Sequence, residues 1–289
     1  MLKDQATNLR FLADRQRDDG ERYRRNSQQM VIVTGGKGGV GKSFVSLHLS
    51  HALAGTGKKV LLVDSNLRNP SLHILTNTDP LFPLNYWIEE AIPIERTGLI
   101  EIGQNLDFLP NIPPHRHRKN RFREDANMFL ELLEPLCGEY DYLILDTETG
   151  LNTWNLSLIL QAGLTVLVSI SDPTSVIDTY TFIKASFPHL KKPHFALVVN
   201  QVIEEKSGFE AYTNLNQALN NFLDYRIELL SLIPFDLKVK RAGLAQQPLW
   251  QFSKNSKVLP SIQKMAERIF QMQENKLLYK SKQLQEVNL

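Results

Sequence analysis

Short runs of consecutive apolar residues alternate with longer amphipathic stretches from Met30 onward. Uninterrupted apolar runs are typical of strands buried on both faces of a sheet, and the stretches between them have the spacing of helices. The predicted strands are 30–34, 59–64, 105–110, 140–146, 164–170, 194–200 and 227–234. The predicted helices are 42–54, 124–137, 154–162, 174–187 and 211–224. This order predicts an α/β fold with a mostly parallel sheet of about seven to eight strands and helices on both faces.

Two segments flank this predicted domain, which spans residues 30–258. Residues 1–29 are rich in Arg, Asp and Gln and poor in core-sized side chains, so we expect an extension with a short helix near 4–13. Residues 259–289 form a tail with apolar side chains on one helical face. The members of this stripe are Ile262, Met265, Ala266, Ile269 and Phe270.

Composition narrows the class of protein. With 289 residues and 42% hydrophobic side chains, the chain can bury a sizeable core. Its 33 basic and 31 acidic side chains nearly cancel, so no global field favours nucleic acid or a membrane. The single cysteine, Cys137, excludes an intramolecular disulfide or a Cys-rich metal site within one chain. No run of about 18 apolar residues and no signal peptide is evident, so we expect the cytoplasm.

A glycine-rich loop lies between the first predicted strand and the first predicted helix. It reads VTGGKGGVGKS and fits the phosphate-loop pattern G-x-x-x-x-G-K-[ST]. Backbone N–H groups of such a loop converge on phosphate oxygens, Lys42 can bridge the terminal phosphates, and the Ser43 hydroxyl can ligate Mg²⁺. Asp146 ends another predicted strand and suits the carboxylate that holds Mg²⁺ through water. The expected nucleotide-binding residues are Gly36, Lys37, Gly38, Gly39, Val40, Gly41, Lys42 and Ser43.

Lys37 places a second lysine inside the same loop. Two cations this close would crowd one nucleotide, unless Lys37 reaches a phosphate held by a second subunit. The pattern K-G-G-x-x-G-K-[ST] resembles the deviant phosphate loop of the MinD/ParA ATPase class. The resemblance implies a MinD-like P-loop NTPase fold, ATP as the nucleotide, and an ATP-dependent homodimer in which Lys37 acts across the interface.

The stretch VDSN at 63–66 is similar to the D-x-D first switch of that class. Asp64 matches the first carboxylate and is expected near Mg²⁺, whereas Asn66 replaces the carboxylate that orients and helps to deprotonate the attacking water in relatives. An amide can position water but cannot hold a proton, so we expect slow hydrolysis. The turn TETG at 147–150 is expected to form the second switch, and transfer of the base role to Asp146 or Glu148 is an open alternative. The expected catalytic residues are Lys37, Lys42, Asn66 and Asp146.

The N-terminal extension carries the most specific motif. DQATNLR at 4–10 matches the D-Q-A-x-x-L-R motif of the FlhG group, also called FleN or YlxH, and the segment at 169–184 is similar to the same group. In that group, which regulates flagellar number, the motif docks on the GTPase FlhF and stimulates its GTP hydrolysis. The resemblance implies partner binding through Asp4, Gln5, Ala6, Leu9 and Arg10. Flagellar switch or C-ring proteins, or a flagellar transcription regulator, are further implied partners.

The resemblance also assigns a base pocket and a role for the tail. Asn200 ends a predicted strand at a position where relatives contact adenine, and Pro234 begins a segment similar to the one that lines the base pocket. Relatives carry a C-terminal amphipathic helix that meets the membrane when ATP drives dimerisation. The apolar stripe of the tail therefore either packs on the core or contacts inner-membrane lipid, which would place the protein peripherally on the cytoplasmic membrane face.

Two rival functions remain open beside that of a flagellar regulator. A ParA-like cargo-positioning ATPase would bind DNA nonspecifically, and the basic loop at 115–123 is its local support, although the near-neutral charge disfavours nucleic acid. A scaffold that holds ATP with little hydrolysis fits Asn66. Iron–sulfur carriers with this phosphate loop are disfavoured, because Cys137 alone cannot provide a bridging cluster site.

Overall fold

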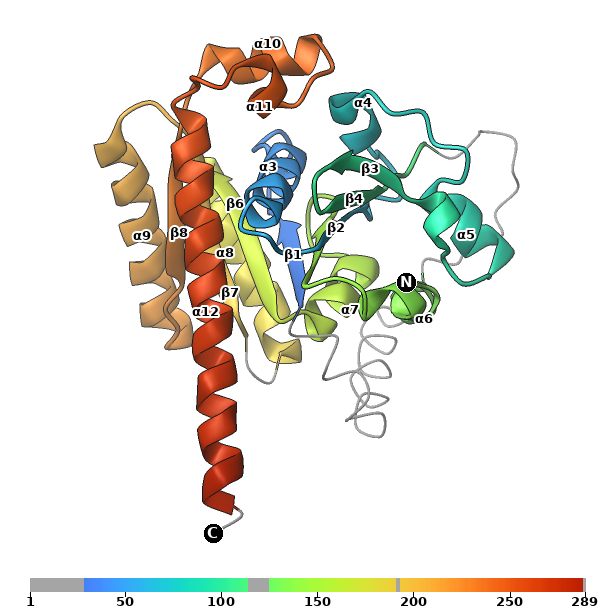
Figure 1. Ribbon diagram of the computed structural model, residues 1–289. Helices are drawn as coiled ribbons and strands as arrows, with labels where there is room; N and C mark the ends of the chain where they lie inside the picture. The colour runs from blue at the N-terminus through green and yellow to red at the C-terminus, as the bar shows by residue number, and fades with distance from the viewer. Residues whose placement is uncertain (1–28, 114–124, 191–192, 288–289) are drawn as a thin grey trace, which may run out of the picture.

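The computed structural model describes residues 29–113, 125–190 and 193–287, with side chains up to residue 274 of the last helix. Within these residues, eight strands form one sheet in the order β3-β4-β2-β5-β1-β6-β7-β8 (Figure 1). All neighbouring strands are parallel except β3 and β4. The strands are β1 (Met30–Thr34), β2 (Val60–Asp64), β3 (Ile100–Gly103), β4 (Leu106–Leu109), β5 (Tyr142–Asp146), β6 (Leu164–Ile170), β7 (Phe195–Val202) and β8 (Glu228–Pro234). The predicted α/β fold is confirmed.

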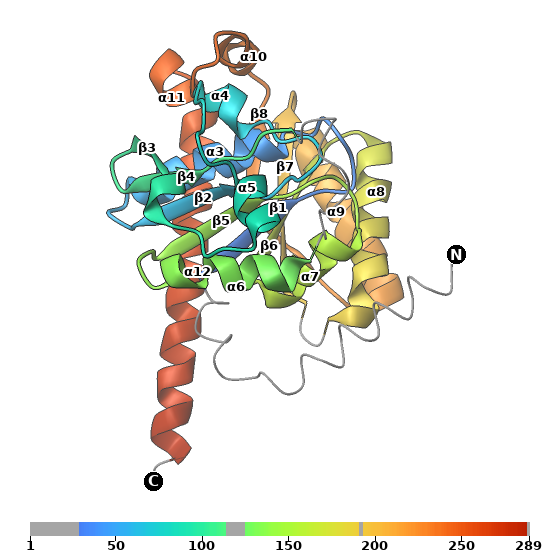
Figure 2. The same ribbon diagram turned by 90° about the vertical axis from the view of Figure 1, so that its right-hand side faces the viewer.

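Helices cover both faces of the sheet (Figure 2). One face packs against α3 and α12, and the other against α5 to α9, so the sheet separates two apolar clusters. The longer helices are α3 (Lys42–Ala54), α6 (Ala126–Cys137), α7 (Thr153–Gln161), α8 (Pro173–Ser186), α9 (Glu205–Leu223) and α12 (Val258–Val287). The shorter ones are α4 (Leu72–Thr76), α5 (Leu84–Glu90), α10 (Leu237–Leu244), α11 (Leu249–Phe252) and the 3-10 turns η1 (Arg96–Gly98) and η2 (Phe187–His189).

Parallel pairing brings the carboxyl ends of the central strands to one edge of the sheet. Asp146 is paired in register with Val33 of β1 on one side and with Asp64 of β2 on the other. The loops that follow these three strands therefore meet at one place. This edge carries the candidate site.

The C-terminal helix α12 is part of the core along its first half. It lies across α3 and β8 (Figure 1). Four residues of the predicted apolar stripe are buried there: Ile262, Met265, Ala266 and Ile269. Phe270 is half-buried, and the Lys58 ammonium lies 5.4 Å from its ring centroid. The protein's own α3 and β8 cover the stripe in this structure. Of the two alternatives for the tail, packing on the core is therefore the one that these four residues adopt. No helix among the described residues is long and apolar enough to cross a membrane.

Several elements differ from the sequence-based expectation: the short helices α4, α5, α10 and α11 were not predicted, and neither were β3 and the start of α9. Strand β3 has no predicted counterpart, because its four residues are only partly buried at an antiparallel edge and so lack a continuous apolar run. Helix α9 begins at Glu205 instead of residue 211. Its first turns carry Gly208, where an added Cβ would lie 3.1 Å from Leu232 and Val202. Close packing on the sheet therefore allows a helix where a glycine within a polar stretch gave a poor helical signal.

Candidate functional site

The glycine-rich loop connects β1 to α3 and is shaped by two close approaches. A Cβ at Gly36 would lie 2.4 Å from the Asp178 carbonyl oxygen of α8. Gly41 has φ 93° and precedes α3, and a Cβ there would lie 2.3 Å from Asn200 Nδ2. The same Nδ2 donates a hydrogen bond to the Val40 carbonyl at 2.8 Å. Glycine is thus required by contact as well as by backbone conformation, and Asn200 lies directly against the loop.

Lys42 opens α3 and points into the site. Its Nζ donates a 2.6 Å hydrogen bond to Thr149 Oγ1 in the loop after β5. Burial lowers the pKa of Lys42, and the nearby Asp146 carboxylate opposes this effect. A mostly buried ammonium beside a glycine loop and a helix N-terminus suits a terminal phosphate. Thr149 lies in the turn predicted as the second switch, but it was not singled out as a site residue, because nothing in the sequence shows its contact with Lys42.

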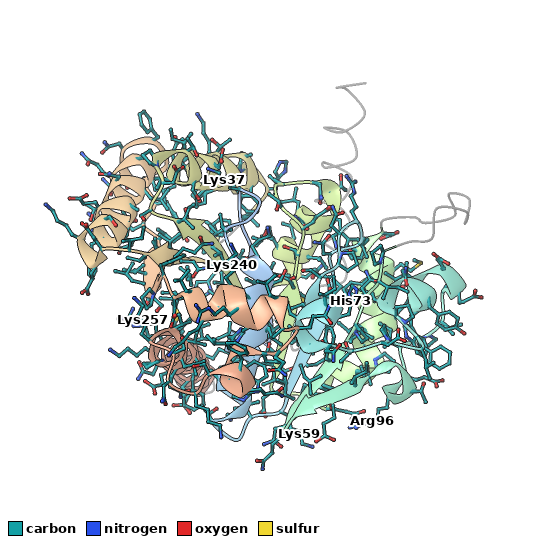
Figure 3. All side chains as sticks on the ribbon, turned by 90° about the horizontal axis from the view of Figure 1, so that it is seen from above. Lys37, Lys59, His73, Arg96, Lys240 and Lys257 are labelled. Carbon is teal, nitrogen blue, oxygen red and sulfur yellow. The ribbon has the colours of Figure 1, made fainter. Side chains whose placement is uncertain are left out.

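Lys37 lies on the upper surface of the molecule (Figure 3). Its Nζ donates to Asp172 Oδ1 at 3.2 Å and to Thr174 Oγ1 at 2.5 Å. Asp172 also caps α8 by accepting the Thr174 and Ser175 backbone N–H groups. The Thr174 hydroxyl, followed by Lys37, lowers the pKa of the Asp172 carboxyl to about 2. In a single protomer, Lys37 therefore contacts α8 of its own chain.

Asp146 is fully buried at the end of β5. Its Oδ1 accepts a 2.9 Å hydrogen bond from Ser46 Oγ, and Ser43 also hydrogen-bonds to the carboxylate. Its Oδ2 is buried without a hydrogen-bond partner among the described residues. Burial raises the pKa of Asp146 to about 6, against the opposing effects of Ser43, Ser46 and Lys42.

Asp64 is the second buried carboxylate and is paired with Asp146 across the β2–β5 ladder. Its oxygens accept backbone N–H groups from Asn66 at 3.3 Å, Ser71 at 3.1 Å and Leu72 at 3.0 Å. Burial and then the Asp146 charge raise the pKa of Asp64, and the three N–H bonds oppose the rise. Asp64 thus orders the loop of the first switch in addition to its expected place near Mg²⁺.

The residues at this edge fit a nucleotide-bound Mg²⁺. The unpartnered Asp146 Oδ2 is a hard oxygen ligand beside the Ser43 hydroxyl, which itself accepts from Ser71 Oγ at 3.1 Å. Among the described residues, no group of three or more His, Cys, Asp or Glu side chains could hold a metal. Mg²⁺ usually takes one or two carboxylates, with water and phosphate completing its octahedron. Ser43 and Asp146, with Asp64 behind them, suit that arrangement.

Asn66 closes a turn in the first switch. Its Oδ1 accepts from Asn69 N at 3.0 Å and its Nδ2 donates to the Asn69 carbonyl at 2.8 Å. The Asn66 carbonyl accepts in turn from Nδ2 of the buried Asn111 at 3.3 Å. The structure thus places the Asn66 amide on its own loop, and its role in orienting water stays a prediction.

Glu148 belongs to the second switch, the loop after β5, and contacts the first switch. Its Oε2 is 3.6 Å from Arg68 Nε of the first switch, and its Oε1 accepts from Asn152 Nδ2 at the start of α7. The Glu148 side chain is 12% exposed. Glu148 therefore connects the two loops to each other.

The expected base pocket is fixed to the phosphate-loop helix through histidine. His48 of α3 accepts the Leu249 N–H at Nε2 (3.0 Å) and donates from Nδ1 to the Phe44 carbonyl (2.8 Å). Burial lowers the pKa of His48 to about 3, so the ring is neutral. One turn later, His51 stacks on Trp250 with ring centroids 3.9 Å apart. These residues position α10 and α11, and none was predicted, because the contact joins segments about 200 residues apart.

Other predicted site residues are placed less directly. Pro234 ends β8 and is paired with Val202, and the following Phe235 N–H donates to the Val202 carbonyl at 2.8 Å. Contact of Asn200 and Pro234 with adenine remains a prediction. The predicted partner-binding residues Asp4, Gln5, Ala6, Leu9 and Arg10 lie outside the described residues.

Fold and site define a P-loop NTPase. A family model described as ParA, NUBPL iron-transfer P-loop NTPase, matches residues 26–270, and the chain belongs to this family. The antiactivator FleN of Pseudomonas aeruginosa is 25% identical over 249 residues, which cover 83% of this chain and 86% of FleN. The flagellum site-determining protein YlxH of Helicobacter pylori is 24% identical over 244 residues, covering 84% and 82%. The resemblance to the FlhG group is thereby confirmed.

Solved structures agree with this assignment of the fold. The cell division ATPase MinD of Pyrococcus furiosus superposes with a TM-score of 0.70 at 22% identity, covering 85% of this chain and 99% of MinD. MinD of Pyrococcus horikoshii, solved as a complex with Mg-ADP, gives a TM-score of 0.61 at 24% identity over 83% of this chain and 94% of that one. These similarities confirm the MinD-like fold.

Proposed function

We propose that this chain is an ATP-dependent dimeric switch that regulates flagellar number and placement. The observation that carries the proposal is a deviant phosphate loop with Lys37 at the protein surface, in a chain related to FleN and YlxH along more than four-fifths of its length. Lys37 and Lys42 contact different parts of the chain, Asp172 and Thr149 respectively. This separation supports a role for Lys42 on the nucleotide of its own protomer and for Lys37 on that of a second copy.

Hydrolysis in this proposal is slow. Asp146 and Ser43 hold Mg²⁺, Lys42 and the loop N–H groups bind the phosphates, and Asn66 positions water without accepting its proton. Bound Mg²⁺ would neutralise charge that develops on the phosphates. Asn66→Asp should raise the rate of phosphate release, while Lys42→Ala should abolish ATP binding. An unchanged rate in Asn66→Asp, in a variant that still binds ATP, would refute the assigned role of Asn66 and favour a scaffold that seldom hydrolyses ATP.

The N-terminal motif is proposed to stimulate an FlhF-like GTPase. Gln5 carries a side chain that can orient a water molecule without acting as a base, and Leu9 and Arg10 would contribute apolar and ionic contacts. The test is GTP hydrolysis by the cognate FlhF-like protein with and without a peptide of residues 1–20. Stimulation that is lost in a Gln5→Ala peptide would support the proposal. Absence of stimulation by the native peptide would refute it.

An iron-transfer role is less favoured for this chain. Its single cysteine, Cys137, is buried in α6, and burial raises the pKa of its thiol to about 12. A thiolate ligand would therefore be costly to form at this position.

Flagellar switch proteins, or a flagellar transcription regulator, remain the proposed downstream partners.

The proposed location is the cytoplasm, with contact to the membrane surface as a separate proposal. Since Ile262, Met265 and Ile269 are buried, such contact would depend on the sequence beyond residue 274, which contains three lysines at 276, 280 and 282. The test is co-sedimentation with anionic vesicles, with and without ATP, of the full chain and of a chain ending at residue 274, which keeps the buried stripe. Equal sedimentation of both chains would discard the proposal.

A further inference from the structure

A cavity of about 460 Å³ lies along β8, the edge strand at the end of the sheet opposite β3. Figure 1 shows β8 with α9 on one side and α12 on the other. The apolar part of the lining includes Val202, Ile203, Phe209, Leu229, Leu232 and Pro234. Ile203 is 83% exposed and Phe209 is 48% exposed at its mouth. The volume is within the range of about 300–1,000 Å³ that is usual for small-ligand sites.

Helix α12 supplies a cationic wall to this cavity. Lys264 and Arg268 line it and are separated by four residues, so they share one helix face. Neither forms an ion pair with another of the described residues. Glu205 is the one acidic side chain in the lining, so two positive charges and one negative charge leave a net charge of +1. Seven apolar side chains and an excess of positive charge favour an apolar ligand with an anionic end.

Arg268 determines what kind of ligand can enter. Its Nη1 donates to the Leu229 carbonyl at 2.6 Å and to the Leu230 carbonyl at 2.8 Å. These bonds hold the guanidinium against the carbonyl groups of two consecutive residues at the start of β8. Both bonds come from one nitrogen, and a guanidinium has further N–H donors on Nε and Nη2. A carboxylate can therefore be bound by these donors and by the Lys264 ammonium.

We propose that this cavity binds a single-chain amphipathic carboxylate, of which a fatty acid is the simplest example. The chain lies along the apolar side chains of β7, β8 and α9, and the carboxylate meets Lys264 and Arg268 on α12. The cavity shares Pro234 with the expected base pocket, but the rest of its lining lies along the flank of the sheet, whereas the phosphate loop and the two switch loops follow β1, β2 and β5. The proposal thus goes beyond the nucleotide switch and does not depend on it.

The test is binding of carboxyl-labelled [1-¹³C]dodecanoate to the full-length protein by NMR, below its micelle concentration. Dodecyltrimethylammonium, with the same chain and the opposite charge, is the control ligand. Saturable binding of dodecanoate with weaker binding of the cation supports the proposal. Absence of saturable dodecanoate binding, or equal binding of both amphiphiles, overturns it.

Variants locate the ligand in the cavity. Lys264→Gln should weaken dodecanoate binding by about fivefold, because it removes one charge-assisted hydrogen bond from a partly exposed site. Phe209→Asp, which places a carboxylate at the exposed mouth, should weaken it further. Lys257→Gln is the matched control, since Lys257 lies just before α12 and outside the lining (Figure 3). Equal affinities of the wild type, Lys264→Gln and Phe209→Asp would overturn the assignment to this cavity.

Discussion

Replacing Asp146 with asparagine tests whether the buried negative charge of this carboxylate destabilises the folded protein in the absence of nucleotide. Asp146 is fully buried, faces the buried Asp64, and has one carboxylate oxygen without a described partner. Its pKa rises from 3.8 to about 6, mainly through burial. A raised pKa in the folded state means that the protonated form is favoured by folding. This contribution to stability is fully present below pH 3.8 and is lost as the pH rises through about 6.

The size of the effect follows from that difference in pKa. The pKa of Asp146 rises from 3.8 in the unfolded chain to about 6 in the folded protein, and each unit of this rise is worth ~1.4 kcal/mol. At pH 7.5, where the carboxyl is ionised in both states, the folded protein is therefore destabilised by ~3 kcal/mol. Asparagine resembles the protonated carboxyl at every pH, and its oxygen can still accept from Ser46. Without nucleotide, Asp146→Asn should therefore be more stable than the wild type by ~3 kcal/mol at pH 7.5, by roughly half of that at pH 5, and by little at pH 4.

Urea unfolding at these three pH values measures the difference, with a thermal shift on the order of 5 °C expected at pH 7.5. Asp141→Asn is the matched control, because Asp141 is exposed, its ion pair with Lys58 spans 3.9 Å, and an amide oxygen can still accept the Lys59 N–H that Asp141 accepts at 2.8 Å. Mg-ATP at about a hundredfold excess over its Kd should stabilise the wild type by ~2.7 kcal/mol but not Asp146→Asn. A variant that is less stable at pH 7.5, or a gain that is the same at pH 4, would refute the reasoning.

Three further changes address other contacts of the site. Asp172→Asn removes the carboxylate that holds Lys37 at 3.2 Å and should increase the fraction of dimer formed with a non-hydrolysable ATP analogue in light scattering; an unchanged fraction would show that this contact does not restrain Lys37. His48→Phe leaves the Leu249 N–H without its buried acceptor and should lower the free energy of unfolding by ~1–3 kcal/mol in urea, with no loss expected if the bond is unimportant. Gly41→Ala, with φ 93° and a Cβ 2.3 Å from Asn200 Nδ2, should weaken binding of a fluorescent ATP analogue by about tenfold or more. Gly39→Ala, which has positive φ but meets nothing within 4 Å, should do so less, and equal losses would exclude the contact with Asn200 as the cause.

Local patterns predicted most of the elements. The helix predicted at 42–54 is observed as Lys42–Ala54, because it begins directly after the glycine loop and Gly55 follows its last residue. The strands that are buried on both faces were also found, since a short continuous apolar run bounded by polar residues is typical of such a strand. Strand β3 was missed because an edge strand needs no such run, and the start of α9 because packing of Gly208 outweighs helical propensity.

The candidate site also contains residues that the sequence could predict and contacts that it could not. The phosphate loop could be predicted because consecutive residues supply its geometry, and Asp146 because the end of a parallel strand faces that loop. Thr149 on Lys42, Asp172 on Lys37 and Ser46 on Asp146 could not be predicted. Each is an ordinary polar residue that acquires its role through a contact with a distant part of the chain.

The sequence by itself determined the class of this protein, namely a P-loop NTPase of the MinD/ParA type, because the phosphate loop, the strand periodicity and the strand-end carboxylate are all local features. Only the tertiary structure decided which neighbours these residues have. It put Lys37 on Asp172, Lys42 on Thr149, and the apolar stripe of the tail against α3 and β8. The physical reason is that hydrogen bonds, burial and the resulting pKa values depend on distances between segments, and these distances exist only after the chain has packed.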